Sequence, residues 1–581
     1  MKNCWNLEKI YKNDTEVQAA VSYIESLLKN ISSLKENPLD NLKVLLDEVF
    51  EASKKMETLY AYSHMKRDED SRVSKYQKLA LEVEALANEV STACSFLEPF
   101  ILGLSEDRLN SILTSEEFSL YHKYLNRILR FKPYTLSEKE EYVLSMTSEI
   151  GGAPENAFYM LSYANIVFPV LENHPEKERL TQSNYVPILS EGNLNLRKEA
   201  FSASYKVYGE HINTLASTLF SNIKRLVIEA KLRGYESALA MELYKNQIST
   251  KVYEALIESV HRYLPSLEEY FSIKKSILGL EEYHMYDIYM PAMNDLDKKI
   301  SYEEAKKMVY EAVAPLGEDY QAIIKKAFDE NWIDVYPRDG KKSGAYSWGS
   351  YETDPYILMN YNDNLDSVFT LAHELGHSVH SYYSREANPY VYSSYTLFVA
   401  EVASTFNELL LLDYLLERAE SKEERIYLIN HYLDSYKGTV FRQTQFAEFE
   451  KKTHERVENK EALTAEDFTS MYYDLNKTYY GKHVISDEKI GMEWARIPHF
   501  YSNFYVYQYA TGLSASSVLS QGVLSKKEGA LQAYKAFLHD GGQHYPLEQL
   551  KSAGADMENP QTVDIALQKF DSLVKELKKL S

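Results

Sequence analysis

Two histidines with three residues between them are the feature of this sequence that points most directly to chemistry: His373-Glu374-Leu375-Gly376-His377. On a helix, residues four apart lie on one face, about 6 Å apart along the axis, so two imidazoles can hold one Zn²⁺. The intervening Glu374 can reach a water molecule at that metal and accept its proton. The motif therefore predicts one zinc ion per chain and a general base, with zinc-activated water attacking a carbonyl group.

The residues around this motif predict a helix whose ligands face away from the hydrophobic core. Drawn as a helical wheel, the segment has one apolar face, formed by Val368, Leu371, Ala372, Leu375 and Val379. His373 and His377 fall on the opposite side, as expected for ligands that face a cleft. A histidine that only fills a core would lie within the apolar face. Asp366 or Ser367 is expected to cap the start of the helix.

A zinc site needs a third ligand, and His380 is the nearest candidate in the sequence. A rise of about 1.5 Å per residue puts it about 10 Å along the axis from His373, too far for one metal with bonds of about 2.1 Å. The metzincin extension is absent, because it requires glycine at position 380 and histidine at 383, where this chain has His380 and Tyr383. His380 is therefore interpreted as a residue that lies behind the ligands or lines the cleft.

A better third ligand is Glu401, in the separate helical segment LFVAEVASTFNELLLLDYLL. Its neighbours are apolar or small, which suits a carboxylate entering a buried site: Val399, Ala400, Val402 and Ala403. Glu408 follows two turns later on the same face. It is a candidate for orienting a ligand histidine through a hydrogen bond. An ordinary surface acid explains Glu408 equally well.

A late aromatic segment, IPHFYSNFYVYQYATG, also contains groups that could take part in catalysis. His499 opens it, and Tyr501, Tyr505 and Tyr509 follow at steps of four, which would form one stripe on a helix. A tyrosine hydroxyl or a histidine N–H can donate a hydrogen bond to the oxyanion that forms during attack on a peptide carbonyl. The pattern alone favours an aromatic stripe that packs a core.

The elements that must position these residues are mainly helical. The first 150 residues have apolar residues at helical spacing. Residues 150–195 are rich in turns and predict a small hairpin or an irregular connector. Residues 330–365 predict a small β-sheet directly before the HELGH helix, and the remainder is again helical. The predicted organisation is an N-terminal helical lobe, 1–190, and a catalytic lobe, 191–581.

Charge and cysteine content exclude several classes of protein. With 86 acidic and 64 basic residues, the net charge is −22, which argues against nucleic-acid partners and against binding to an anionic membrane surface. The acids are expected on a solvated surface, although an acidic cavity for cationic substrates is an alternative. Two cysteines, Cys4 and Cys94, make no disulfide framework. With no apolar signal core and no stretch long enough for a membrane span, the prediction is a cytoplasmic protein.

The HELGH helix, the FVAEVASTFNE segment and the IPHFYSNFYVYQYATG segment together resemble oligoendopeptidase F, of the thimet oligopeptidase family of zinc metallopeptidases. The resemblance extends from WNLEKIY near the N-terminus to GGQHYPLEQLKSAGADM. It implies a mainly α, two-lobed metallopeptidase with a deep central channel, and an active site on the channel floor. It further implies an endopeptidase that cleaves short, unstructured oligopeptides.

Carried over to this sequence, the resemblance implies that His373, His377 and Glu401 are the zinc ligands and that Glu374 is the base. It reverses the preference for a core stripe in the late segment, since the family uses a histidine and tyrosines there. His499 and one of Tyr505, Tyr507 and Tyr509 are then the oxyanion donors. The stretch GKKSGAYSWG resembles a segment along the cleft, with Gly344, Ala345 and Tyr346 contacting substrate. A structural hairpin is the alternative.

Two other functions stay open at this point. A carboxypeptidase on a similar scaffold would need a cation for the terminal carboxylate of its substrate, and Arg338, Arg442 and Arg496 are all candidates. A non-catalytic zinc protein would normally have four protein ligands, whereas three are found here beside an intact Glu374. Oligomeric state and side-chain preference do not follow from the sequence.

Overall fold

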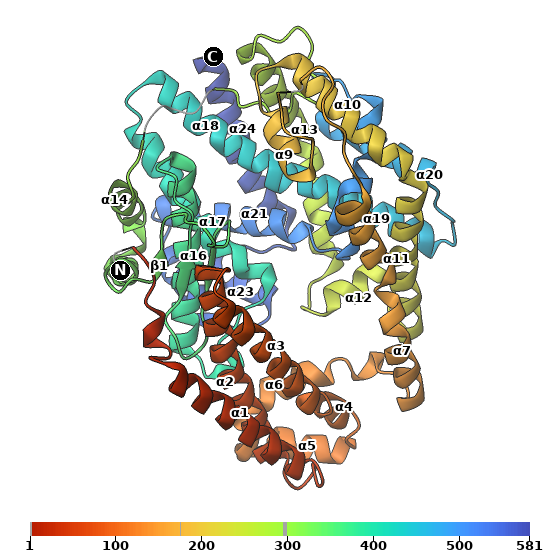
Figure 1. Ribbon diagram of the computed structural model, residues 1–581, viewed down its shortest axis with the longest axis vertical. Coiled ribbons are helices and arrows are strands. Elements are labelled where there is room, and N and C mark those ends of the chain that lie inside the picture. The colour runs from red at the N-terminus through yellow and green to blue at the C-terminus, as the bar shows by residue number, and fades with distance from the viewer. Residues whose placement is uncertain (1–2, 175, 294–298) are drawn as a thin grey trace. The chain divides into compact units, whose positions relative to one another are not determined.

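Long helices make up most of the chain, as Figure 1 shows for this computed structural model. The structure describes residues 3–174, 176–293 and 299–581. The prediction of a mainly α protein is confirmed. None of the described helices is long and apolar enough to cross a membrane.

The chain divides into two compact units, each assembled from three segments. Unit 1 comprises Met1–Thr135, Lys298–Tyr414 and Leu519–Gly554, and unit 2 comprises Leu136–Asp297, Leu415–Val518 and Ala555–Ser581. The predicted division at residue 190 differs from this one, because residue 190 falls inside unit 2. A single boundary cannot separate two units that are each assembled from three separate segments of the chain. The predicted central channel stays a prediction.

Unit 1 holds the HELGH helix. Its α-helices are α1 (Asp14–Leu34), α2 (Leu42–Glu69), α3 (Ser74–Cys94), α4 (Leu97–Leu102), α5 (Glu106–Thr114), α6 (His122–Leu129), α14 (Tyr302–Ala312), α15 (Glu318–Asp329), α16 (Leu365–Ala387), most of α17 (Leu397–Arg418), α22 (Ala530–Asp540) and α23 (Pro546–Ala553). Helix α2 is the most buried of the N-terminal helices. The apolar cluster around it includes Tyr356 and Leu358, so the sheet and the N-terminal helices share one core.

Unit 2 holds the late aromatic segment. Its α-helices are α7 (Glu138–Gly151), α8 (Ala153–Tyr159), α9 (Gln182–Leu189), α10 (Leu194–Glu210), α11 (Ile212–Arg233), α12 (Ala238–Tyr244), α13 (Thr250–Ile277), α18 (Lys422–Tyr436), α19 (Arg442–Glu458), α20 (Ala465–Tyr480), most of α21 (Tyr507–Leu524) and α24 (Pro560–Leu580). Two 3₁₀ helices, Glu488–Arg496 and Pro498–Tyr501, precede α21.

The small sheet predicted between residues 330 and 365 is confirmed. Its strands are β1 (Ile333–Asp334), β2 (Tyr346–Trp348) and β3 (Tyr356–Leu358), in the order β1-β3-β2. Strand β3 is parallel to β1 and antiparallel to β2, with Ser347 opposite Ile357. Strand β2 is therefore an edge strand. Both β2 and β3 contact α16, so the sheet lies beside the HELGH helix.

The described residues between 150 and 195 form neither a hairpin nor a single strand. Residues 166–174 and 176–181 are irregular, as one of the two predictions stated, and helix α9 follows. Thr181 starts that helix, because its side chain accepts a hydrogen bond from the N–H of Asn184, whose side chain accepts one from the N–H of Thr181. This reciprocal cap stabilises a helix where the apolar pattern was too short to show one.

Candidate metal centre

Helix α16 places His373 and His377 one turn apart on the same face. Its cap is Asn364, not the predicted Asp366 or Ser367, because Asn364 has an extended backbone and accepts a hydrogen bond from the N–H of Ser367 at 2.9 Å. The two imidazoles turn toward one another, and their Nε2 atoms lie 3.1 Å apart. This is the convergence that the spacing of the two histidines predicted.

Glu401 on α17 completes a group of three ligand atoms. Its Oε2 lies 3.4 Å from Nε2 of His373 and 3.5 Å from Nε2 of His377. Three atoms bound at about 2.1 Å around a tetrahedral zinc ion lie about 3.4 Å from one another. The side chains present therefore fit a zinc ion in both type and spacing, and His373, His377 and Glu401 form a metal-binding triad among the described residues.

Gly376 explains how α17 comes so close to α16. A Cβ at this position would lie 2.6 Å from the carbonyl oxygen of Ala403 and 2.6 Å from Cα of Ser404. Both atoms belong to the backbone of α17 and cannot rotate away. The glycine inside the HELGH motif is therefore required for the close approach that brings Glu401 to the histidines.

A buried polar link that no sequence pattern predicts also holds these helices. Asn407 of α17 donates from Nδ2 to the carbonyl of Ala372 in α16 at 3.1 Å. The hydroxyl of Tyr320, in α15, donates to Oδ1 of Asn407 at 2.9 Å. Both side chains are buried. The only sequence signal was an asparagine within an otherwise apolar helix, directly before Glu408.

Glu408 contacts the ring nitrogen of His373 that faces away from the triad. Oε1 of Glu408 and Nδ1 of His373 are within hydrogen-bond distance. A proton on Nδ1 would leave Nε2 free to bind a metal. Burial lowers the pKa of His373, but the hydrogen bond to Glu408 and the charges of the nearby carboxylates outweigh it and raise the pKa to about 9. A metal ion must therefore displace a proton that the carboxylates stabilise.

The two remaining carboxylates of the motif region differ in their pKa. Burial raises the pKa of Glu374, whose side chain is almost completely enclosed. Burial acts in the same direction on Glu401, but hydrogen bonds from His377 and Ser404 and the positive charge of the histidines lower its pKa to about 2. Glu401 is therefore suited to remain an anionic ligand. Glu374 holds a proton more readily, as a group that accepts and returns one must.

His380 lies on α16 but is surrounded by aromatic rings. Its ring stacks on Tyr395 with centroids 3.7 Å apart, and the ring of Phe537 lies 5.2 Å away. Burial lowers the pKa of His380 to about 3, which keeps it neutral. The predicted place behind the ligands stays a prediction.

The predicted substrate segment precedes and enters the edge strand β2. Gly344 has a positive φ of 81°, and its carbonyl accepts a hydrogen bond from Asn360 at 2.8 Å. Ala345 is half-buried, and the hydroxyl of Tyr346 donates to Asp68 at 3.1 Å. A hydrogen bond of 2.8 Å between the hydroxyls of Ser347 and Ser378 ties β2 to α16. The contact of these residues with substrate stays a prediction.

In unit 2, the late aromatic segment does not form one helical stripe. Helix α21 begins only at Tyr507, because Asn503 and Phe504 have positive φ values of 32° and 55°. The N–H of Phe504 donates to the carboxyl group of Glu450 at 2.8 Å, which holds this turn. Sequence reasoning missed the turn, since neither residue is a glycine.

The candidate oxyanion donors have different surroundings within unit 2. His499 is exposed, and its ring is nearly parallel to that of Tyr505, 6.4 Å away. Tyr505 and Tyr509 are half-buried, with their hydroxyl oxygens 3.4 Å apart. Tyr507 is 4% exposed and packs on Tyr253. Exposure therefore favours Tyr505 and Tyr509 over Tyr507 as donors to a substrate.

The three arginines considered as clamps for a terminal carboxylate are all ion-paired. Arg338 binds Asp334 through two hydrogen bonds of 2.6 Å. Arg442 and Arg496, in unit 2, share the single carboxylate of Glu493. No sequence pattern distinguishes these three residues.

One helix that carries both histidines and an acid between them is the arrangement of zinc-dependent peptidases. Comparison with protein families narrows this class. The model of Peptidase family M3 matches residues 188–569, and the model named Oligopeptidase F matches residues 101–168. The chain therefore belongs to peptidase family M3, and it is a peptidase.

Individual relatives agree with this assignment. Oligopeptidase PepF of Bacillus subtilis (strain 168) is 42% identical, over 100% of this chain and 87% of the relative. An oligoendopeptidase F homolog of Lactococcus lactis subsp. lactis is 40% identical, over 100% and 97%. The crystal structure of oligoendopeptidase-F from Enterococcus faecium superposes with a TM-score of 0.76 at 36% identity, covering 98% of this chain and 99% of that one. The resemblance to oligoendopeptidase F is confirmed.

Proposed function

We propose that this peptidase is a zinc endopeptidase that hydrolyses short, unstructured oligopeptides, with Glu374 as general base. The observation that carries the proposal is the spacing of three ligand atoms. Nε2 of His373 and Nε2 of His377, both on α16, and Oε2 of Glu401, on α17, lie 3.1–3.5 Å from one another. When bound, Zn²⁺ lowers the pKa of water and polarises a peptide carbonyl.

The side chains of the metal centre then have separate roles in the reaction. His373, His377 and Glu401 hold the metal, and Glu408 orients His373 by accepting a hydrogen bond from Nδ1. Glu374 accepts a proton from the attacking water and returns it to the leaving amine. Its enclosed position supports both transfers, because burial raises its pKa above the ordinary value of a glutamate carboxyl.

Binding of the peptide is assigned to two further regions. As an edge strand, β2 can pair with an extended peptide backbone at Tyr346, its first residue, and at Gly344 and Ala345, which precede it. His499 and either Tyr505 or Tyr509 would donate hydrogen bonds to the oxyanion. The exposure of these groups supports this assignment over one to the buried Tyr507.

The substitution Glu374→Gln tests the mechanism, since it removes the base and leaves the ligands in place. Activity on short peptides should fall by about 10²–10⁴-fold while zinc content is unchanged. Glu386→Gln is the matched control, because Glu386 is an exposed acid on the same helix. A Glu374→Gln protein that cleaves peptides at nearly the wild-type rate would disprove the role of this residue.

A digest of mixed short peptides, read by mass spectrometry with and without chelator, tests the substrate class. An endopeptidase should cleave peptides with an amidated C-terminus at internal bonds, whereas a carboxypeptidase should leave them intact. Chelator should abolish cleavage. Zinc content without any chelator-sensitive hydrolysis would support the non-catalytic alternative instead.

We also propose a cytoplasmic location. Cys4 and Cys94 are both unpaired in the structure, as a reducing compartment would keep them. Fractionation of cells that express the protein would test this.

A further inference from the structure

A buried cluster in unit 2 contains more positive than negative charge. Glu493 is almost completely buried, and Oε1 and Oε2 accept hydrogen bonds from Arg442 at 2.8 and 3.3 Å. Arg496 donates to the same Oε1, and the hydroxyl of Tyr472 donates to Oε2 at 2.6 Å. One carboxylate thus serves two guanidinium groups.

The pKa shifts of Glu493, Arg442 and Arg496 all favour the ionised form. Burial raises the pKa of Glu493, but the two arginines outweigh it and lower the pKa to about 2. Burial lowers the pKa of both arginines, but the charge of Glu493 outweighs it and raises both well above the ordinary value. One net positive charge therefore remains. Such a charge is unfavourable in an enclosed position unless an anion pairs with it.

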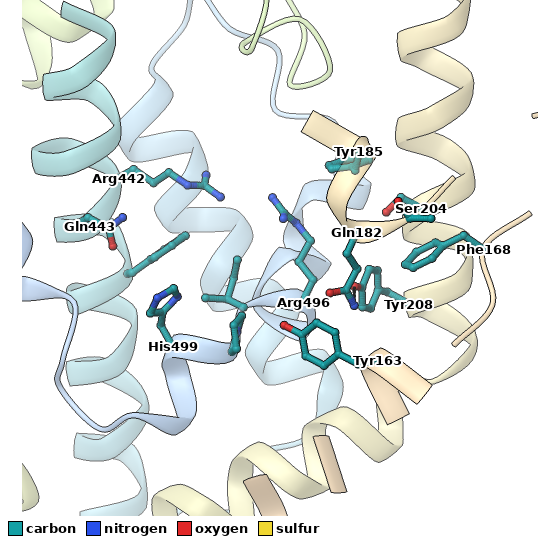
Figure 2. A pocket seen from close by; sticks show the side chains of 14 residues that line it. Tyr163, Phe168, Gln182, Tyr185, Ser204, Tyr208, Arg442, Gln443, Arg496 and His499 are labelled. Atoms are coloured by element: carbon teal, nitrogen blue, oxygen red, sulfur yellow. Dashed lines mark hydrogen bonds between the residues drawn. The ribbon is translucent and has the colours of Figure 1, made fainter. Parts of the chain in front are cut away.

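The unbalanced charge faces a cavity of about 330 Å³. Figure 2 shows the guanidinium groups of Arg442 and Arg496 turned toward one another at this cavity, with His499 in the same wall. About one sixth of each arginine side chain is exposed. Each guanidinium group has five N–H donors, and the hydrogen bonds to Glu493 use one each on Nη1 and Nη2 of Arg442 and one on Nη2 of Arg496. Donors thus remain for a ligand.

Aromatic rings fix the orientation of both cations. The guanidinium group of Arg442 lies over the ring of Phe446, and that of Arg496 lies over the ring of Tyr185, at 4.7 and 5.4 Å. A planar guanidinium held in this way presents its donors in a fixed arrangement that matches a carboxylate.

We propose that this cavity binds a carboxylate group, with Arg496 and Arg442 as its donors. Because His499 lines the same cavity, the carboxylate we infer is one of the peptide substrate, either an acidic side chain or the C-terminus. That source of the carboxylate rests on the proposed function. The cavity would then make the enzyme prefer peptides with an acidic group at a fixed position.

Binding is the first measurement, made by calorimetry on the Glu374→Gln protein, which should not consume its ligand. The probes are amidated peptides in which a single glutamine is moved along the chain, each paired with the same peptide carrying glutamate there. A further pair compares a free C-terminus with an amide. One position should favour the acid by about ten-fold in Kd, since hydrogen bonds to charged groups exceed neutral ones.

Substitution of Arg496 assigns the preference to this cavity. Arg496→Gln removes the net charge but leaves Arg442 paired with Glu493, so the acid-to-amide ratio should fall to about one, and Arg496→Lys should retain part of it. Arg425→Gln is the matched control, because Arg425 pairs with Glu576 elsewhere in unit 2 and should leave the ratio unchanged. Equal binding of acid and amide at every position would already argue against a substrate carboxylate, whether or not the variants fold.

Acetate tests a free carboxylate as the alternative source. If peptides show no acid preference, but acetate at constant ionic strength raises Tm of the parent protein and not of Arg496→Gln, the cavity binds free anions. If neither effect occurs, the proposal is overturned. A protein that prefers acidic peptides yet hydrolyses none would disprove the proposed function and leave the cavity assignment standing. A protein that hydrolyses peptides but shows neither an acid preference nor an acetate effect would disprove the cavity assignment and leave the proposed function standing.

Discussion

The metal centre of unit 1 and the segment His499–Tyr509 of unit 2 are held in place in different ways. At the metal centre, helix geometry sets the spacing of His373 and His377, and a glycine lets Glu401 approach from the next helix. In the other segment, a turn at Asn503 and Phe504 interrupts the helix, and residues distant in the sequence hold it: Glu450 accepts a hydrogen bond from the N–H of Phe504, and Asn222 donates one to Oδ1 of Asn503. The first region depends on regular backbone and close packing. The second depends on polar contacts with residues far away in the sequence.

Removal of the third ligand should have the largest effect on the metal centre. Glu401→Ala leaves two histidines and should reduce zinc affinity by more than the 10–100-fold typical of residues that only orient a ligand. Glu408→Ala is the natural comparison, because it removes such an orienting residue and should stay near about 10–100-fold. Competition with a zinc indicator would measure both. Equal losses in the two variants would contradict the assignment of Glu401 as ligand and Glu408 as its support.

The substitution Gly376→Ala tests the contribution of helix packing to the metal centre without changing any metal ligand. Gly376→Ala places a Cβ against the backbone of α17, so the free energy of unfolding should fall by about 3 kcal/mol, with weaker zinc binding. Gly522→Ala in α21 is the matched control, because its Cβ would meet only an ordinary contact with Ala530 at 3.4 Å. That variant should be neutral or slightly more stable. Denaturant unfolding with and without zinc measures both.

This difference in support explains which parts of the molecule could be predicted. The helices and the convergence of His373 and His377 follow from periodicity, because regular backbone converts residue spacing into distance. Glu401 lies on a separate helix, and its apolar neighbours and the family resemblance were what pointed to it. Even in α16, Asn364 rather than Asp366 or Ser367 is the cap, since an N-cap residue requires an extended backbone that spacing does not reveal.

Contacts between distant parts of the chain were beyond prediction. Glu450 and Phe504 are 54 residues apart, and Glu493 and Arg442 are 51 apart. No periodic pattern links such pairs. The sequence also does not show that the stripe from Tyr501 to Tyr509 is interrupted, because a left-handed turn without glycine carries no clear signal. The two discontinuous units likewise could not be inferred from composition along the chain.

The turn in unit 2 should respond to pH through Glu450. Burial raises the pKa of this carboxyl to about 8, although the N–H of Phe504 acts in the opposite direction, and Glu242 adds to the increase. A folded-state pKa above that of the unfolded chain stabilises the protein at low pH, and this stability is lost as pH rises through the folded value. Between about pH 6 and pH 7.5, Glu450 should therefore lower the free energy of unfolding by about 2 kcal/mol.

Glu450→Gln should flatten this pH dependence, because glutamine keeps the acceptor for Phe504 and cannot ionise. Glu455→Gln, on the exposed side of the same helix, should leave the dependence as in the wild type. Denaturant unfolding at several pH values measures both variants. A wild-type slope that survives in Glu450→Gln would show that another group controls it.

The smallest expected effect concerns the link behind the metal centre. Tyr320→Phe removes the donor to Oδ1 of the buried Asn407 and should lower the free energy of unfolding by about 1 kcal/mol. Tyr534→Phe removes an equally buried hydroxyl for which the described residues provide no hydrogen-bond partner, so it should be neutral or stabilising. Zinc affinity should change little in Tyr320→Phe, because Asn407 still donates to Ala372. A large loss of zinc affinity would instead mean that the metal centre, like the turn at Phe504, depends on polar contacts for its position.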